Sequence, residues 1–140
     1  MEQHVQLLTL TASLERLPEV LEAVGGAAIA AGLPEARCDH LALAVEEAFV
    51  NICRHAYAGN AGRIDVRVGH RQGEVSIELA DEGPPFDPLA TAAPDPDRPL
   101  DDRTPGGMGI MLLKTITDEV RYSRDQERNV LAMVVRTRDA

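Results

Sequence analysis

The chain has 140 residues, of which 44% are hydrophobic and 26% are charged. These values are those of an ordinary globular protein, and the length fits one domain, so we expect residues 1–140 to fold as a single unit. The net charge of −9 argues against direct binding to nucleic acid, because such proteins need surplus Lys and Arg to neutralise phosphates. No run approaches the roughly 18 apolar residues that span a membrane, and no signal-peptide pattern is present. We therefore expect a cytoplasmic protein without membrane contact.

The first predicted elements are a strand over residues 4–11 and a helix that follows it. Ser13 can cap this helix, and Pro18 fits only in a first turn, so the helix is expected to begin near Leu17 and to end near Gly32. Its apolar face is predicted from spacings of three and four: Leu14, Leu17, Leu21 and Val24.

A second helix is predicted from Pro34 to about His55, since proline suits the first position of a helix. Its buried stripe is predicted to comprise Leu41, Val45, Ala48 and Ile52. Cys38 and Cys53 both fall in this helix and lack CxxC spacing, so we expect two free, buried thiols and no zinc or redox site.

Two alternating segments, residues 63–69 and 74–80, predict antiparallel strands joined by a hairpin-like His-Arg-Gln-Gly connection. Residues 82–106 hold seven of the nine prolines, which exclude a regular element there. A long structureless loop in a compact domain is usually functional or disordered. A helix is expected from about Met108, and two closing strands are expected over residues 120–123 and 130–136, which together give a mixed α/β domain.

Three polar residues, Glu47, Asn51 and His55, are spaced by four on the second helix, with Arg54 beside them. This spacing places the three on one side of the helix. An Asn carbonyl can ligate Mg²⁺, a Glu can accept a proton, and an Arg can pair with a phosphate. The simpler interpretation is an exposed polar face with i,i+4 contacts, and the helix alone does not exclude it.

Asp81 shares its parity with the apolar residues Val75, Ile77 and Leu79, so it is predicted to point toward the core. A carboxylate in that position needs hydrogen-bond donors, and the amino group of a purine is a suitable one. The alternative is an Asx-type turn at the start of the Asp-Glu-Gly-Pro loop.

The third motif is Gly106-Gly-Met-Gly109, which precedes a predicted helix. Glycines let backbone amides approach phosphate oxygens, and a helix N-terminus adds a favourable dipole. A flexible turn is the alternative. A Rossmann motif is excluded because no strand comes directly before the glycines, and a P-loop is excluded because no Gly-Lys-Ser/Thr follows.

These three stretches resemble the boxes of a known superfamily. AVEEAFVNICRHAY resembles the N-box, DEGPPF the G1 box and GGMGI the G2 box of the GHKL ATPases. The small size and the HAY ending make the chain most similar to the RsbW-type anti-sigma factor serine/threonine-protein kinases. The resemblance implies an α+β fold: a two-layer α/β sandwich of Bergerat type, with a mixed, mostly antiparallel sheet and helices on one face.

The resemblance also implies roles for the residues of the second helix. Asn51 would hold the Mg²⁺ that bridges the ATP phosphates, and Glu47 would be the catalytic base, with Glu46 as the alternative base. Arg54 stands where the superfamily often has a phosphate-contacting residue, and His55 belongs to the same nucleotide-binding face.

Further roles follow for the other two boxes. Asp81 would bind the adenine amino group, Gly83 would allow the turn beside the base, and Asn129 would lie near adenine. At this last position Arg128-Asn129 replaces the family's frequent Gly-Thr or Gly-Asn. The lid loop, at about residues 84–106, is long and acidic compared with the family. Four residues of the G2 box would wrap the phosphates: Gly106, Gly107, Met108 and Gly109.

The function implied by the resemblance is an ATP- and Mg²⁺-dependent protein kinase. It would phosphorylate a STAS-domain anti-sigma-factor antagonist, sequester a sigma factor, and form a homodimer for which the first strand is the expected edge. Two alternatives remain: a non-catalytic nucleotide-binding switch, and a detached histidine-kinase catalytic domain, for which the sequence offers no helical hairpin carrying a phosphoacceptor histidine.

Overall fold

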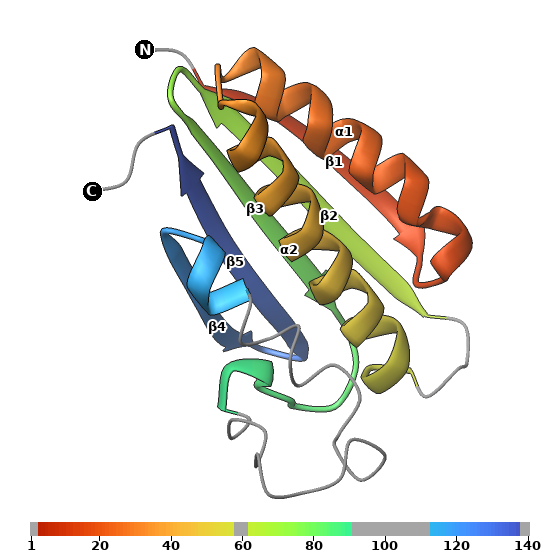
Figure 1. Cartoon of the computed structure of the whole chain (residues 1–140). Helices are drawn as coiled ribbons and strands as arrows, with labels where there is room; N and C mark the ends of the chain where they lie inside the picture. Colours follow the sequence, from red (N-terminus) through yellow and green to blue (C-terminus); the bar gives the residue numbers. More distant parts are fainter. Residues whose placement is uncertain (1–2, 58–61, 91–112, 138–140) are drawn as a thin grey trace, which may run out of the picture.

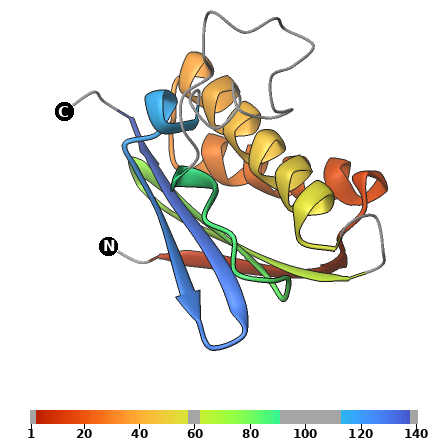
Figure 2. The ribbon, with the colours of Figure 1, turned by 90° about the horizontal axis from the view of Figure 1, so that it is seen from below.

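The computed structural model describes residues 3–57, 62–90 and 113–137, and these residues form two layers (Figure 1). One layer is a five-stranded sheet, and the helices cover only one of its faces, as the view from below shows (Figure 2). The predicted two-layer sandwich is therefore confirmed. The elements are β1 (His4–Thr11), η1 (Leu14–Arg16), α1 (Leu17–Ala30), α2 (Glu35–His55), β2 (Arg63–Arg71), β3 (Glu74–Asp81), η2 (Pro88–Ala90), β4 (Glu119–Asp125) and β5 (Arg128–Arg136).

The strands lie in the order β1-β2-β3-β5-β4, and every pairing among the described strands is antiparallel. We expected a mixed, mostly antiparallel sheet; here β2–β3 and β4–β5 are joined by short turns, and the β1–β2 and β3–β5 pairs are antiparallel as well. The first strand is an edge of the sheet, as predicted. The β2–β3 turn is shorter than expected, because β2 continues to Arg71 and only Gln72 and Gly73 remain outside the strands. Gly73 adopts a φ of 87°, which favours glycine in a tight turn.

The core lies between α1, α2 and the inner face of the sheet. All four residues predicted as the buried stripe of α2 are at most 9% exposed, together with Ala44 and Phe49. The face predicted for α1 was wrong at Leu14, which is 57% exposed because it lies in the separate turn η1. The buried face of α1 instead comprises Val20, Val24, Ala27 and Ala28.

The outer face of the sheet is exposed to solvent and carries ion pairs between neighbouring strands. Arg67 lies 3.9 Å from Glu78, and Glu74 contacts both Arg71 and Arg136 at 3.0 Å. Such exposed pairs contribute little stability, but they keep this face polar. The site must therefore be built on the inner, helix-covered face.

The start of α2 is fixed to the far end of the sheet by a nearly buried ion pair. Arg37 contacts Asp118 at 2.5 Å, and their side chains are only 14% and 16% exposed. The same guanidinium donates to the carbonyls of Ile116 and Arg136 at 3.2 and 3.1 Å, and Asp118 accepts from the Arg136 amide at 2.6 Å. This cluster, which we call the Arg37 clamp, joins α2 to the end of the helical turn at residues 113–116 and to β5.

The two cysteines are free and lie on α2, as predicted, but both are half-buried rather than buried. Burial is still sufficient to raise the pKa of the Cys53 thiol. Among the described residues, no helix is both long and apolar enough to cross a lipid bilayer.

Candidate nucleotide site

A small pocket lies where the end of α2 passes over the end of β3 and the start of β5. Asp81, the last residue of β3, lies directly opposite Asn129 in the register of the two strands. The helix supplies Asn51 and His55, and the irregular segment after β3 supplies Phe86. The pocket is lined by Ala48, Asn51, Ile52, His55, Ala56, Asp81, Phe86, Pro88, Tyr122, Asn129 and Leu131.

Asp81 is buried, as its parity predicted, and is only 4% exposed. Its Oδ1 accepts hydrogen bonds from the Gly83 amide and from Asn129 Nδ2, both at 2.9 Å. The bond from Gly83 is the Asx-type turn that we considered as the alternative interpretation. The turn and the buried position thus occur together, because the same carboxylate closes the turn and lines the pocket.

Asn129 connects the polar groups around this pocket through hydrogen bonds, and it is 6% exposed. While its Nδ2 donates to Asp81, its Oδ1 accepts from the Tyr122 hydroxyl at 2.5 Å, from Arg124 Nη1 at 3.1 Å and from the Phe86 amide at 3.2 Å. This network satisfies the buried amide and fixes its orientation, so that the carboxylate of Asp81 is held from the side of β5.

Gly83 is required by a close approach of two backbones. A Cβ at this position would lie 2.6 Å from the carbonyl oxygen of Ala56 and 2.8 Å from the Ala56 Cβ. The turn after Asp81 therefore packs directly on the end of α2. Glycine at position 83 and alanine at position 56 together let the strand end meet the helix end.

Only part of the polar face of α2 lines the pocket. Asn51 and His55 line the pocket, and the His55 ring stacks on Phe86 with ring centroids 4.9 Å apart and an interplanar angle of 21°. Glu47 is half-buried one turn before Asn51 and is not a pocket-lining residue, and Arg54 is exposed. The structure thus brings Asn51, His55, Asp81 and Asn129 together and leaves Glu47 and Arg54 outside the pocket lining, and the roles of all six residues stay predictions.

The pocket is nearly closed in this structure. Its cavity volume of about 20 Å³ has room for about one water molecule, whereas small-molecule pockets measure roughly 300–1,000 Å³. Most lining residues belong to α2, β3, β4 or β5, but Phe86 lies in an irregular segment and is 39% exposed. In this arrangement the cavity is too small for a purine, and the exposed Phe86 segment is one boundary of it.

The residues fit a nucleotide with a single magnesium ion. The described residues contain no group of three or more His, Cys, Asp and Glu side chains arranged to hold a metal. Mg²⁺ bound to ATP needs few protein ligands, since phosphates and water fill most of its coordination shell. The half-buried amide of Asn51 would supply one such ligand. The predicted G2 residues 106–109 lie outside the described residues.

Sequence reasoning missed Phe86, Tyr122 and Arg124 as neighbours of the site. Phe86 is part of the DEGPPF stretch, so an aromatic residue so close to a predicted adenine ligand was a usable signal. Tyr122 and Arg124 gave no such signal, because they reach the pocket only through the pairing of β4 with β5.

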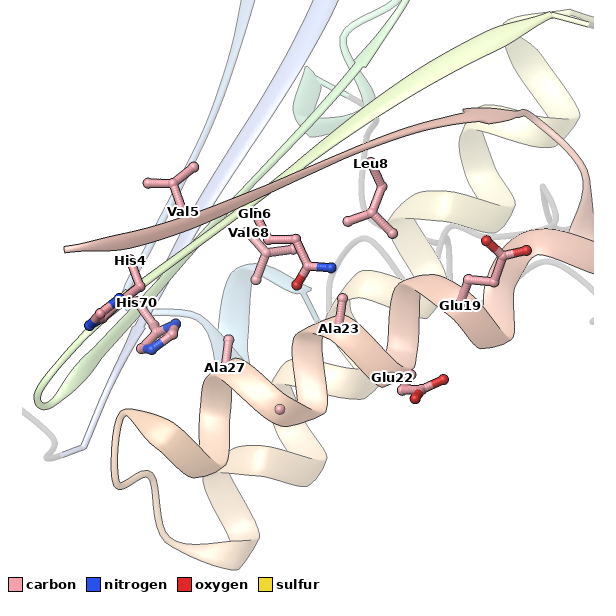
Figure 3. Close-up of a pocket in the computed structure, with 11 residues that line it drawn as sticks. His4, Val5, Gln6, Leu8, Glu19, Glu22, Ala23, Ala27, Val68 and His70 are labelled. Carbon is pink, nitrogen blue, oxygen red and sulfur yellow. The ribbon is translucent and has the colours of Figure 1, made fainter.

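A larger hollow lies elsewhere, between the edge strand β1 and α1, with a volume of about 610 Å³ (Figure 3). Ala23, Ala27 and Val68 line it, together with Glu19 and Glu22 of α1. At one end the rings of His4 and His70 stack 5.0 Å apart. Among the described residues, none from the first two sequence motifs lines this hollow.

Comparison with known proteins defines the class of this fold and site. Residues 10–135 match the histidine kinase-like ATPase domain family, and the chain belongs to this family. The predicted resemblance to RsbW-type proteins is confirmed by its relatives. The serine/threonine-protein kinase BtrW of Bordetella bronchiseptica is 34% identical over 94 residues, which are 66% of this chain and 66% of that protein. The serine-protein kinase RsbW of Bacillus licheniformis is 35% identical over 92 residues, which are 62% of this chain and 58% of that protein.

These alignments span less than two thirds of the relatives' own length. A crystal structure of RsbU and RsbW domains from Mycobacterium tuberculosis has a TM-score of 0.66 and 16% identity, and the match covers 95% of this chain and 32% of that one. At this identity the likeness supports the fold alone. It agrees with the sandwich of an antiparallel sheet and helices described above.

Proposed function

We propose that this protein is an ATP-dependent serine/threonine-protein kinase that acts as an anti-sigma factor in a partner-switching module. Membership of the ATPase family and the two relatives named as kinases support the activity. The observation that carries the proposal is the buried Asp81–Asn129 pair beside Asn51, because it combines an adenine-type acceptor with a magnesium-type ligand in one pocket.

In this mechanism Asp81 would accept a hydrogen bond from the adenine amino group, and Asn51 would hold a Mg²⁺ ion bound with the nucleotide. The metal supplies charge neutralisation on the transferred phosphoryl group. Glu47 takes the proton of the acceptor hydroxyl, and Arg54 contacts a phosphate at the exposed side of α2. Phosphoryl transfer depends mainly on positioning and electrostatic stabilisation, which this set of groups can provide.

The proposed partners are a STAS-type antagonist, whose Ser or Thr receives the phosphate, and a sigma factor, which the protein sequesters to regulate transcription. With these partners, the proposed location is the cytoplasm. A homodimer through the β1 edge is part of the same proposal. It is supported by the terminal position of β1 in the sheet and by Val5 and Leu7, which are 49% and 67% exposed.

The kinase proposal is tested by incubating the full chain with Mg-ATP and its cognate STAS protein, and by following the phosphorylated product by mass spectrometry. The wild type is expected to transfer one phosphate, and Glu47→Gln is expected to slow transfer by about 10²- to 10⁴-fold, the usual contribution of a general base. Glu35→Gln, at an exposed position of the same helix, is the matched control, and Glu46→Gln tests the alternative base. Transfer that is absent in the wild type, or equal in the wild type, Glu47→Gln and Glu46→Gln, contradicts the proposal.

The second candidate is a nucleotide-binding switch that sequesters partners without catalysis. Two observations favour it: the pocket of about 20 Å³, and Arg128 at the position where the family often has glycine. It predicts that the wild type binds ATP and a partner but transfers no phosphate in the assay above.

A further inference from the structure

Tyr57 links three parts of the molecule through one hydroxyl group. It lies two residues beyond α2, donates to the carbonyl of Arg63 at 2.5 Å and accepts from the amide of Glu82 at 2.8 Å. Arg63 begins β2, and Glu82 follows Asp81 at the end of β3. The donor and an acceptor site of the phenol are therefore both used, and both partners are backbone groups.

The ring of Tyr57 packs closely against Gly62. A Cβ at Gly62 would lie 2.3 Å from the ring atoms, so the ring occupies the space that any other residue at position 62 would need. The carbonyl of Gly62 in turn accepts from the Ala12 amide at 2.8 Å. Burial raises the pKa of Tyr57, so the phenol stays protonated and keeps its donor at neutral pH.

The segment that Tyr57 holds is the turn that orients Asp81. The Asp81 carboxylate is fixed from β5 by Asn129 and from its own turn by the Gly83 amide. Among the described residues both bonds reach Oδ1, which leaves Oδ2 with acceptor capacity for a ligand. The direction of Oδ2 depends on the turn, and the turn has two anchors on the end of α2: the Gly83–Ala56 contact and the Tyr57–Glu82 hydrogen bond.

We propose that Tyr57 is a positioning residue for adenine recognition, whose hydroxyl holds the turn after Asp81 so that Oδ2 meets the amino group of the purine. This role rests on the ATP site of the proposed function. Tyr57 itself touches no part of the nucleotide in this proposal, since it is not among the pocket-lining residues. Its effect must therefore depend on the purine amino group and on the Asp81 carboxylate.

The test compares ATP with inosine 5′-triphosphate, which has a carbonyl in place of the amino group. Calorimetry of the full chain measures the Kd of both nucleotides with Mg²⁺. Tyr57→Phe removes only the hydroxyl and is expected to weaken ATP binding by about 5- to 10-fold, the scale of one lost hydrogen bond, while it leaves inosine triphosphate binding unchanged. The preference for ATP therefore shrinks.

A double-mutant cycle separates positioning from a general structural effect. Because Tyr57 acts through Asp81, adding Tyr57→Phe to Asp81→Asn is expected to cause no further loss of ATP affinity. Thr117→Val is the matched control: it also removes a hydroxyl that bonds a backbone carbonyl, that of Leu113 at 2.7 Å, and is expected to leave the nucleotide preference unchanged. Amide exchange at Glu82, which should accelerate in Tyr57→Phe, reports the lost bond directly.

The outcomes distinguish this inference from the proposed function. A wild type without preference for ATP over inosine triphosphate overturns the adenine contact itself, and with it the ATP site. A wild type that prefers ATP, combined with a folded Tyr57→Phe that keeps the full preference or whose effect adds to that of Asp81→Asn, overturns the positioning role of Tyr57 alone.

Discussion

The two ends of α2 are attached to the sheet by different kinds of contact. At the start, the Arg37 clamp joins nearly buried charges and three backbone groups of the C-terminal part of the chain. At the end, the contacts are a backbone approach at Gly83, a phenol bond from Tyr57 and an aromatic stack between His55 and Phe86. The first end has contacts suited to stability, whereas the second end adjoins the pocket and the irregular segment that carries Phe86.

The largest effect is expected at the clamp. Arg37→Met leaves the Asp118 carboxylate nearly buried without its cation, so the free energy of unfolding should fall by about 3 kcal/mol in urea denaturation. ATP affinity of the folded protein should stay the same, because the clamp lies at the opposite end of α2 from the pocket. Arg67→Met is the control, since its exposed pair with Glu78 is worth less than about 1 kcal/mol. A stability loss no larger than that of the control would contradict the comparison.

At Asp81 we expect a loss of ATP affinity, in contrast to the loss of stability expected at Arg37. Asp81→Asn keeps an oxygen for the Gly83 amide but removes the charge that the purine amino group meets, so ATP binding should weaken by about 1–3 kcal/mol in calorimetry. Asp87→Asn is the matched control, because it removes a charge that caps η2 through the Leu89 amide at 2.8 Å. Unchanged ATP affinity in Asp81→Asn would remove this residue from the site.

A smaller effect is expected on the rate of nucleotide entry. Phe86→Ala removes the stack on His55, worth about 0.5–1.5 kcal/mol for an aromatic pair, so ATP association should accelerate by about 2- to 10-fold in stopped-flow measurements. Ile29→Ala, at a position of α1 that is 76% exposed, serves as the control. An association rate equal to that of the wild type would show that another segment limits entry.

The smallest effect is expected for the acid stability that Asp65 of β2 provides. Hydrogen bonds from Arg63, and further bonds from Thr9 and Arg128, hold the pKa of Asp65 below its usual value. A carboxyl with a lowered pKa in the folded state stabilises above its unfolded pKa of about 3.9, and this contribution is lost as the pH falls through the folded value. Asp65→Asn should therefore flatten the decline in unfolding free energy below about pH 4, by at most about 1 kcal/mol. A decline as steep as that of the wild type would contradict this assignment.

Local patterns in the sequence predicted the fold better than they predicted the site. The alternation of Val75, Ile77 and Leu79 was sufficient to place Asp81 in the core, because parity along one strand needs no partner. Leu14 was misplaced because a periodic pattern does not reveal that a separate helical turn precedes α1.

The contacts around the pocket depend on pairings between distant segments. Asn129 reaches Asp81 only through the register of β3 with β5, and the Tyr57 hydroxyl meets Glu82 only because β3 ends beneath α2. Such contacts leave no periodic signal in the chain. The resemblance to the ATPase family named Asn129, but the bonds of Phe86, Tyr122 and Arg124 to it required the structure.

The pairing of Asp81 with Asn129 ties the pocket to the cooperative folding of the sheet. Their 48-residue separation means that the polar centre of the pocket forms only when the hairpin of β4 and β5 has closed onto β3. A nucleotide that binds there would bind only the protein with a fully formed sheet. Added nucleotide should therefore raise the melting temperature in proportion to the logarithm of its concentration. Any change that separates this hairpin from β3 would therefore break the Asp81–Asn129 bond and should lower nucleotide affinity.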